Sequence, residues 1–169
     1  EYRTWDWRVR LFARPGPATG EIALILLDQP SLDWGKRENG LSWPWPREMY
    51  ALVTDFCRRA GAKSVAFDVL FTETSFYGVD DDVSLGRAWA DFGAAVGAAF
   101  LAEEGGSLAD WPPGIAAPDV GVPGLREWLD GRRPRLVEFP TADFPVEEIG
   151  ASARLFANTN FTRDEDGVY

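Results

Sequence analysis

Residues 43–71 read WPWPREMYALVTDFCRRAGAKSVAFDVLF, and this stretch decides the fold class. Pro46 suits the first turn of a helix, and Gly61 stands where a left-handed C-terminal cap is favoured. Between them, apolar residues recur with the period of a helix and predict its core face. They are Met49, Leu52, Val53, Phe56, Cys57 and Ala60. Residues 64–71, rich in Val and Phe, predict a β-strand directly after this helix.

The segments on either side extend this pattern into an α/β fold. Residues 22–27, IALILL, are apolar without interruption and predict a central strand that is buried on both faces, so that residues 22–71 form a strand–helix–strand unit with parallel strands. Later patterns predict helices near 85–92 and 146–154 and strands near 94–101, 136–139 and 155–161. We therefore expect a single α/β domain with a mostly parallel central sheet and flanking helices.

The two remaining segments have different characters. Residues 1–13 place Tyr2, Trp5, Val9 and Phe12 on one stripe, which predicts a helix that packs on one neighbour. The Pro- and Gly-containing residues 14–20 predict a loop, and the Pro/Gly-rich residues 103–134 predict an excursion from the core.

Composition excludes several functions. The 169 residues include 27 acidic and 17 basic side chains and no histidine, which gives a net charge of −10. This charge disfavours nucleic acid as a partner, and the absence of histidine removes imidazole-activated nucleophiles and His-ligated zinc. The longest strongly apolar run, residues 22–27, is far shorter than the roughly 20 residues that span a membrane as a helix.

Acidic residues at the end of the first predicted strand, within and just after the second, and at the start of the next helix are expected to converge at the sheet edge where ligands of parallel α/β folds bind. They are Asp28, Asp68, Glu73 and the run Asp80–Asp82. Clustered carboxylates suit a hard cation, so a Ca²⁺ or Mg²⁺ site formed by Asp28, Asp68 and Asp81 is one prediction. The alternative is structural: Asp28 caps a turn, Asp68 pairs with Arg47 or Lys63, and the triple aspartate caps a helix.

Two further motifs each allow two interpretations. In residues 43–47, WPWPR, the prolines restrict the backbone and present Trp43 and Trp45 either as a binding shelf or as a lid on the sheet, with Arg47 placed to neutralise carboxylates. Asn158 and Asn160 share one face of a predicted strand and could hydrogen-bond a ligand or a backbone. The motif DEDG at residues 164–167 lacks EF-hand spacing and predicts a tight turn.

Taken together, these motifs resemble the CHASE2 family of bacterial extracytoplasmic sensor domains. The resemblance rests on WPWPR at 43–47, on GAKSVAFDVLF at 61–71 with Glu73, and on the acidic residues 80–82 and 164–166. It implies an input domain of a membrane receptor, with residues 1–13 as a membrane-proximal helix and residues 14–169 as the sensor domain. The domain itself would be non-catalytic, and the flanking transmembrane helices would lie outside this segment.

The resemblance also implies partners for the domain. The output would be a nucleotide cyclase, a diguanylate cyclase or a kinase in the cytoplasm, and the receptor would act as a homodimer. The family supplies no ligand, so we expect a small ligand or a cation beside Asp28, Asp68, Glu73 and Asp81. The alternative function is a Mg²⁺-dependent phosphoryl-transfer or hydrolytic enzyme with Asp28 as its nucleophile.

Overall fold

The computed structural model describes residues 2–102, 112, 124, 127–128 and 139–160, and all statements below concern this part of the chain. It divides into two compact units, one before Pro46 and one over Pro46–Asn160. The predicted excursion over residues 103–134 falls almost entirely outside the described residues, as do residues 136–138 of a predicted strand and the DEDG motif.

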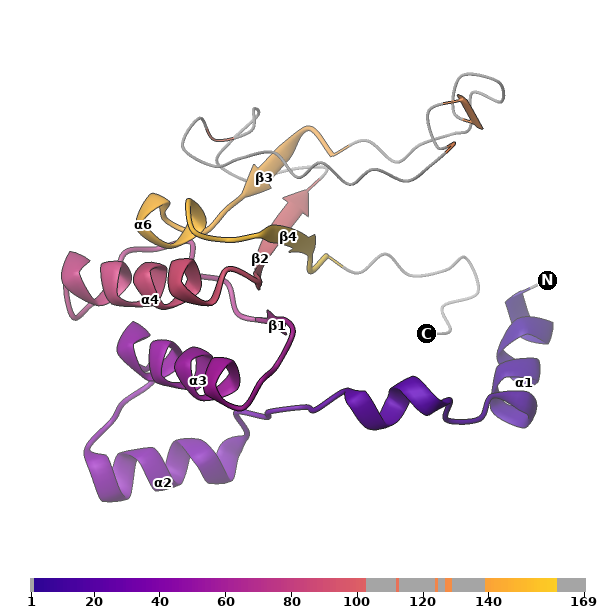
Figure 1. The fold of residues 1–169 in the computed structure, drawn as a ribbon, viewed down its shortest axis with the longest axis horizontal. Helices are drawn as coiled ribbons and strands as arrows, with labels where there is room; N and C mark the ends of the chain where they lie inside the picture. Colours follow the sequence, from indigo (N-terminus) through magenta and orange to yellow (C-terminus); the bar gives the residue numbers. More distant parts are fainter. Residues whose placement is uncertain (1, 103–111, 113–123, 125–126, 129–138, 161–169) are drawn as a thin grey trace. The chain divides into compact units, whose positions relative to one another are not determined.

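The unit before Pro46 consists of helices and the segments that connect them (Figure 1). Helix α1 (Tyr2–Phe12) confirms the predicted N-terminal helix, and a 3₁₀ turn, η1 (Pro17–Glu21), replaces part of the predicted loop. Helix α2 (Gln29–Asn39) was not predicted. Residues 22–28 between η1 and α2 form no strand, so the predicted central strand at 22–27 is wrong.

This failed strand has a physical cause. A strand needs backbone partners along its edges, and within the described residues none of the amides of residues 23–27 donates to another backbone group. Most of the apolar side chains of this segment are also open to solvent, with Leu24 79% exposed.

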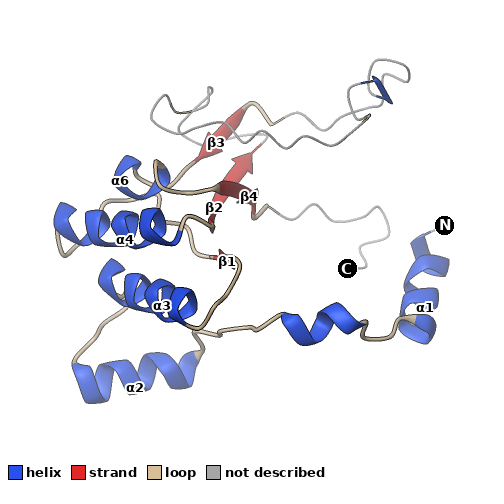
Figure 2. Ribbon diagram, in the orientation of Figure 1, coloured by secondary structure: helices blue, strands red, loops and turns tan. Residues whose placement is uncertain are grey.

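The unit over Pro46–Asn160 is an α/β layer (Figure 2). Its strands are β1 (Val65–Ala66), β2 (Ala95–Ala102), β3 (Thr141–Asp143) and β4 (Leu155–Asn158). Strand β2 pairs in parallel with β1 and β4 and antiparallel with β3. The helices are α3 (Arg47–Arg59), α4 (Val79–Phe92) and the short α6 (Glu147–Gly150). The α/β class with a mostly parallel sheet and flanking helices is confirmed.

Helix α3 forms where the sequence predicts it, but it buries a different face. Gly61 adopts a φ of +80°, and the Ala62 amide donates to the Cys57 carbonyl at 3.0 Å, as in a Schellman cap. Cys57 is buried as expected, together with Tyr50, Ala51 and Thr54. Leu52 and Phe56, which the periodicity places in the core, are 54% and 64% exposed. The predicted core face is therefore wrong for these two residues and for Ala60, which is also exposed.

The hydrophobic core lies beneath α3 and α4. The rings of Tyr50, Phe67, Phe71 and Trp89 contact one another with centroids 5.2–6.5 Å apart, a range typical of packed aromatic pairs. Phe71, Trp89 and Leu85 are fully buried. Because the Tyr50 ring joins this cluster, α3 is rotated so that Tyr50 points inward and Leu52 points outward. These edge-to-face contacts of Tyr50 explain why α3 buries a face that the sequence did not predict.

Candidate functional site

A cluster of hydrogen-bonded polar side chains joins the first turns of α3 and α4. Asp81 of α4 accepts hydrogen bonds from the backbone amides of Arg47 and Glu48 at 2.7 and 2.8 Å. Pro46, the residue before α3, has no side chain that can cap the helix. Asp81 therefore caps α3 from the neighbouring helix, supplying an acceptor to amides that have no partner within α3 itself.

Arg47 lies at the centre of the same cluster. Its Nε donates to Asp82 Oδ1 at 3.2 Å, its Nη2 donates to the Glu73 carbonyl at 2.9 Å, and its guanidinium lies 4.7 Å from the centre of the Phe71 ring. Asp82 is fully buried and Arg47 is 8% exposed. This is a buried ion pair with additional hydrogen bonds, the arrangement in which removal of one partner leaves an uncompensated charge.

Ser75 completes this cluster from the loop before α4. Its amide donates to Asp82 Oδ2 at 2.9 Å, and its hydroxyl bonds Asp81 Oδ2. The Gly78 amide closes a turn on the Ser75 carbonyl at 3.1 Å, and this turn presents Phe76 and Tyr77 to solvent. The two aspartates thus fix both the start of α3 and the turn that precedes α4. We name Arg47, Ser75, Asp81 and Asp82 the junction cluster.

The junction cluster contains Arg47 and Asp81 from the predicted site and bonds the Glu73 backbone. Asp82, the most buried member, was named only as part of the acidic run. Its signal in the sequence is weak, because nothing local shows that the third of three consecutive aspartates points into the core. The predicted neutralising role of Arg47 is confirmed for Asp82, while the Asp68 and Glu73 side chains are exposed and make no ion pair within the described residues.

Asp28 belongs to the other compact unit. Its Oδ1 accepts from the Ser31 amide at 3.0 Å and from the Ser31 hydroxyl at 2.7 Å, so it is the N-cap of α2. These bonds from the Ser31 hydroxyl and amide hold the pKa of the Asp28 carboxyl below its ordinary value. Of the two interpretations of Asp28, the structure therefore shows the cap, because its Oδ1 already accepts two hydrogen bonds from Ser31.

In the region that the structure describes, no three acidic or cysteine side chains gather closely enough to hold a metal ion. Asp28 also lies in a different compact unit from Asp68 and Asp81. The predicted ligand set for Ca²⁺ or Mg²⁺ is not brought together by the described residues.

The two asparagines hydrogen-bond the neighbouring strand. Asn158 Oδ1 accepts from the Leu101 amide at 3.2 Å, and Asn160 Nδ2 donates to the Leu101 carbonyl at 2.6 Å. The backbone amide and the backbone carbonyl of Leu101, near the end of β2, thereby both have a hydrogen-bond partner. Of the two interpretations for Asn158 and Asn160, the structure shows the backbone contact.

The two tryptophans of the WPWPR motif behave differently. Trp43 is 58% exposed, whereas Trp45 is half-buried with its indole against Gly35 of α2. A Cβ at position 35 would lie 2.6 Å from the indole ring, so the glycine permits this close approach. Trp45 therefore packs against α2. Of the two tryptophans, Trp43 is the one whose side chain is exposed enough to form a binding shelf.

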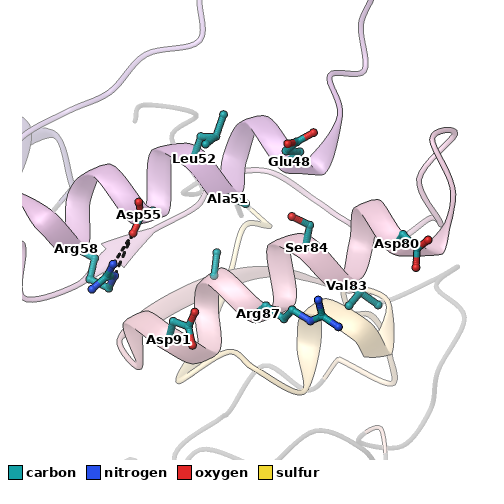
Figure 3. Close-up of a pocket in the computed structure, with 11 residues that line it drawn as sticks. Glu48, Ala51, Leu52, Asp55, Arg58, Asp80, Val83, Ser84, Arg87 and Asp91 are labelled. Carbon is teal, nitrogen blue, oxygen red and sulfur yellow. Dashed lines mark hydrogen bonds and ion pairs between the residues drawn. The ribbon is translucent and has the colours of Figure 1, made fainter.

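A groove runs between α3 and α4 (Figure 3). It has a volume of about 410 Å³. Its walls carry several charged side chains and an apolar strip; they are Glu48, Ala51, Leu52, Asp55, Arg58, Asp80, Val83, Ser84, Arg87, Ala88 and Asp91. Sequence reasoning missed this groove, because the predicted rotation of α3 placed Leu52 in the core.

Charges in the groove are unevenly paired. Asp55 binds both Arg58 and Arg59, at 2.6 and 2.7 Å, and the hydrogen bond from Arg58 is the main cause of the lowered pKa of the Asp55 carboxyl. Within the described residues, Glu48, Asp80 and Arg87 have no ion pair. In the groove, charged side chains of both signs that make no ion pair therefore lie close to the exposed apolar side chain of Leu52.

The family model of the CHASE2 domain matches residues 1–169, the whole chain. The chain belongs to the CHASE2 family, whose members are extracytoplasmic sensor domains. Comparisons with curated proteins and with solved structures gave no match. None of the described helices is both long enough and apolar enough to cross a membrane.

Proposed function

We propose that this chain is the ligand-sensing input domain of a bacterial transmembrane receptor. In this proposal it lies on the extracytoplasmic face of the inner membrane, is joined to transmembrane helices outside this segment, and regulates a cyclase, a diguanylate cyclase or a kinase in the cytoplasm. The observation that carries the proposal is the CHASE2 match over all 169 residues. The side chains of Asp81, Asp82, Asn158 and Asn160 are used in internal hydrogen bonds, so a structural role accounts for them and the sensing role proposed here does not depend on them.

The topology of the parent protein tests the receptor proposal. We expect its reading frame to encode apolar segments of about 20 residues on both sides of this chain. A phosphatase reporter fused after Tyr169 in the parent protein is expected to be active, since this enzyme folds only outside the cytoplasm. A parent protein without such apolar segments would rule the proposal out. So would an inactive phosphatase fusion at Tyr169 together with an active fusion, at the same position, of a reporter that works only in the cytoplasm.

The stimulus in this proposal is a cation or a small cationic molecule. Its support is that the Asp68 and Glu73 carboxylates are both exposed and make no hydrogen bond within the described residues, in a chain of net charge −10. Carboxylate oxygens are the ligands that Ca²⁺ and Mg²⁺ select. Calorimetry with each cation is expected to give heat for the parent chain and less heat for Asp68→Asn. Equal and negligible heats for both chains would remove the cation from the proposal.

A further inference from the structure

The second half of helix α1 exposes a group of apolar side chains. Trp7 and Phe12 are 61% and 69% exposed, and their rings meet edge to face with centroids 6.3 Å apart. Leu11, which is 45% exposed, follows Trp7 by four residues and therefore lies beside it on the helix surface. The three side chains thus form one continuous apolar surface that is open to solvent.

Three arginines surround this apolar surface. Arg10 follows Trp7 by three residues, a spacing that places two side chains next to each other on a helix. Arg8 precedes Leu11 by the same spacing. Arg14 lies just after the end of α1, where its Nη1 donates to the Leu11 carbonyl at 3.0 Å. We name these six residues together the α1 patch: Trp7, Arg8, Arg10, Leu11, Phe12 and Arg14.

The α1 patch has the opposite charge to the rest of the chain. Residues 7–14 contain three arginines and no acidic residue, which gives +3, so the remaining residues carry −10 − 3 = −13. Arg10 and Arg14 make no ion pair within the described residues. The α1 patch therefore attracts an anionic partner at short range, although the chain as a whole repels one.

Two other exposed apolar segments each lack one property of the α1 patch. Phe76 and Tyr77 stand directly before the aspartates at 80–82, which oppose an anionic surface. The amides of residues 23–27 donate to no backbone group within the described residues, and such groups are costly to transfer into an apolar medium. In α1 the helix bonds its own backbone, and Arg14 donates to a carbonyl at the helix end, where intrahelical donors run out.

We propose that α1 binds the surface of an anionic lipid bilayer, with its apolar side chains in the interfacial layer and its arginines at the lipid phosphates. Tryptophan is favoured at this depth because its ring is apolar and its N–H is polar. Arginine binds phosphate through paired hydrogen bonds, and its long stem lets the charge stay in water while the helix is partly immersed. Short helices of this composition lie in the plane of the interface.

The pairing of arginine with apolar side chains favours lipid over other anions. Free phosphate would match the arginines and leave Trp7 and Phe12 in water. A single-stranded nucleic acid offers phosphates and bases that stack on rings, but Leu11 has no ring on which a base can stack. A bilayer offers phosphates with an apolar layer directly beneath them, so it matches both halves of the α1 patch. The receptor proposal would place a membrane near α1, but the exposures and charges that carry this inference are independent of it.

Co-sedimentation of the whole chain with lipid vesicles tests the proposal. We expect binding to mixed phosphatidylcholine–phosphatidylglycerol vesicles, and binding about a hundredfold weaker to pure phosphatidylcholine, because the three arginines then lose their anionic partners. Raising the salt concentration is expected to weaken the binding to anionic vesicles. No binding to anionic vesicles, or equal binding to both kinds, would overturn the proposal. Binding of a single-stranded oligonucleotide by a chain that does not bind vesicles would also overturn it.

Paired variants assign the binding to α1. Trp7→Ala is expected to weaken vesicle binding about tenfold, whereas Trp34→Ala, which removes a 50% exposed tryptophan from α2, is expected to change it by less than about twofold. Arg10→Gln is expected to weaken binding about fivefold. Its control is Arg87→Gln on α4, which alters another exposed arginine without an ion pair in the described part of the chain and is expected to stay within about twofold.

The outcomes of this experiment are separate from those of the receptor test. Alanine at position 7 and glutamine at position 10 both favour a helix, so circular dichroism is expected to stay unchanged. Equal losses in each variant and its control would overturn the assignment to α1, even in a chain that binds vesicles. The receptor proposal is decided by the topology of the parent protein, so either proposal can fail while the other stands.

Discussion

The junction cluster and residues 22–27 reverse the usual relation between polarity and burial. Asp82 carries a charge and is fully buried, whereas Leu24 is apolar and 79% exposed. The difference lies in their partners. Asp82 accepts from Arg47 and Ser75, while residues 23–27 have no backbone hydrogen bond within the described part of the chain. At these two places burial follows the availability of partners rather than the polarity of the single residue.

The largest expected effect removes the buried carboxylate. Asp82→Ala is expected to lower the free energy of unfolding by about 3–5 kcal/mol, because it leaves the buried Arg47 guanidinium without its counter-charge. Urea denaturation followed by tryptophan fluorescence measures this loss. Asp80→Ala, two residues away and exposed, is the matched control, with an expected change within about 0.5 kcal/mol. Equal effects in the two variants would contradict a structural role for Asp82.

Substitutions of two leucines, one in the buried core and one in residues 22–27, allow a direct comparison of the two regions. Leu85→Ala removes a fully buried side chain from α4 and is expected to cost about 2–5 kcal/mol. Leu24→Ala removes an exposed side chain of the same size and is expected to change the stability by no more than about 0.5 kcal/mol. The same denaturation measurement serves both. If Leu24→Ala lowers the free energy of unfolding about as much as Leu85→Ala does, residues 22–27 are buried in solution and the contrast between the two regions is wrong.

A smaller effect is expected at the cap of α3. Asp81→Ala removes the acceptor for the Arg47 and Glu48 amides and is expected to destabilise the protein by about 0.5–2 kcal/mol. Asp81→Asn keeps an acceptor oxygen and should recover part of this loss. Hydrogen exchange of the first turn of α3 gives a local readout, since its amides should exchange faster in Asp81→Ala than in Asp81→Asn.

The smallest effect concerns pH and the cap of α2. The pKa of the Asp28 carboxyl is lowered in the folded chain, so its stabilisation is present above the ordinary value and is lost as the pH falls through the folded pKa. Ser31→Ala removes the hydroxyl donor and is expected to raise the pKa of Asp28 toward its ordinary value. NMR titration of the carboxyl carbon measures the change. An unchanged titration curve in Ser31→Ala would contradict the assigned cause.

Elements whose periodicity and end signals both lie in the local sequence were predicted correctly. Helices α3 and α4 and strands β2 and β4 lie where periodicity and caps placed them. Helix α2 was missed although Asp28, Pro30 and Gly40 are ordinary start and stop signals, because its middle is polar and lacks an apolar stripe. The strand at 22–27 was wrong because apolar composition shows that a segment can be buried but does not supply the neighbour that buries it.

The sequence predicted several residues of the junction cluster but not which of them contact one another. Arg47 and Asp81 were both named as site residues, yet they are 34 positions apart and meet only because α3 and α4 begin at the same end. Likewise the outward rotation of Leu52 depends on the edge-to-face contact of Tyr50 with Phe71. Contacts between distant residues of this kind are set by tertiary packing, and a single sequence does not contain them in readable form.

Cys57 on the inner face of α3 gives the protein a natural reporter. It is the chain's one cysteine, and its side chain is buried. A maleimide reagent can therefore modify the folded chain only after α3 moves away from the residues beneath it. The rate of labelling then measures how often α3 opens, without any introduced probe, and the same readout can follow the helix when a candidate stimulus is added.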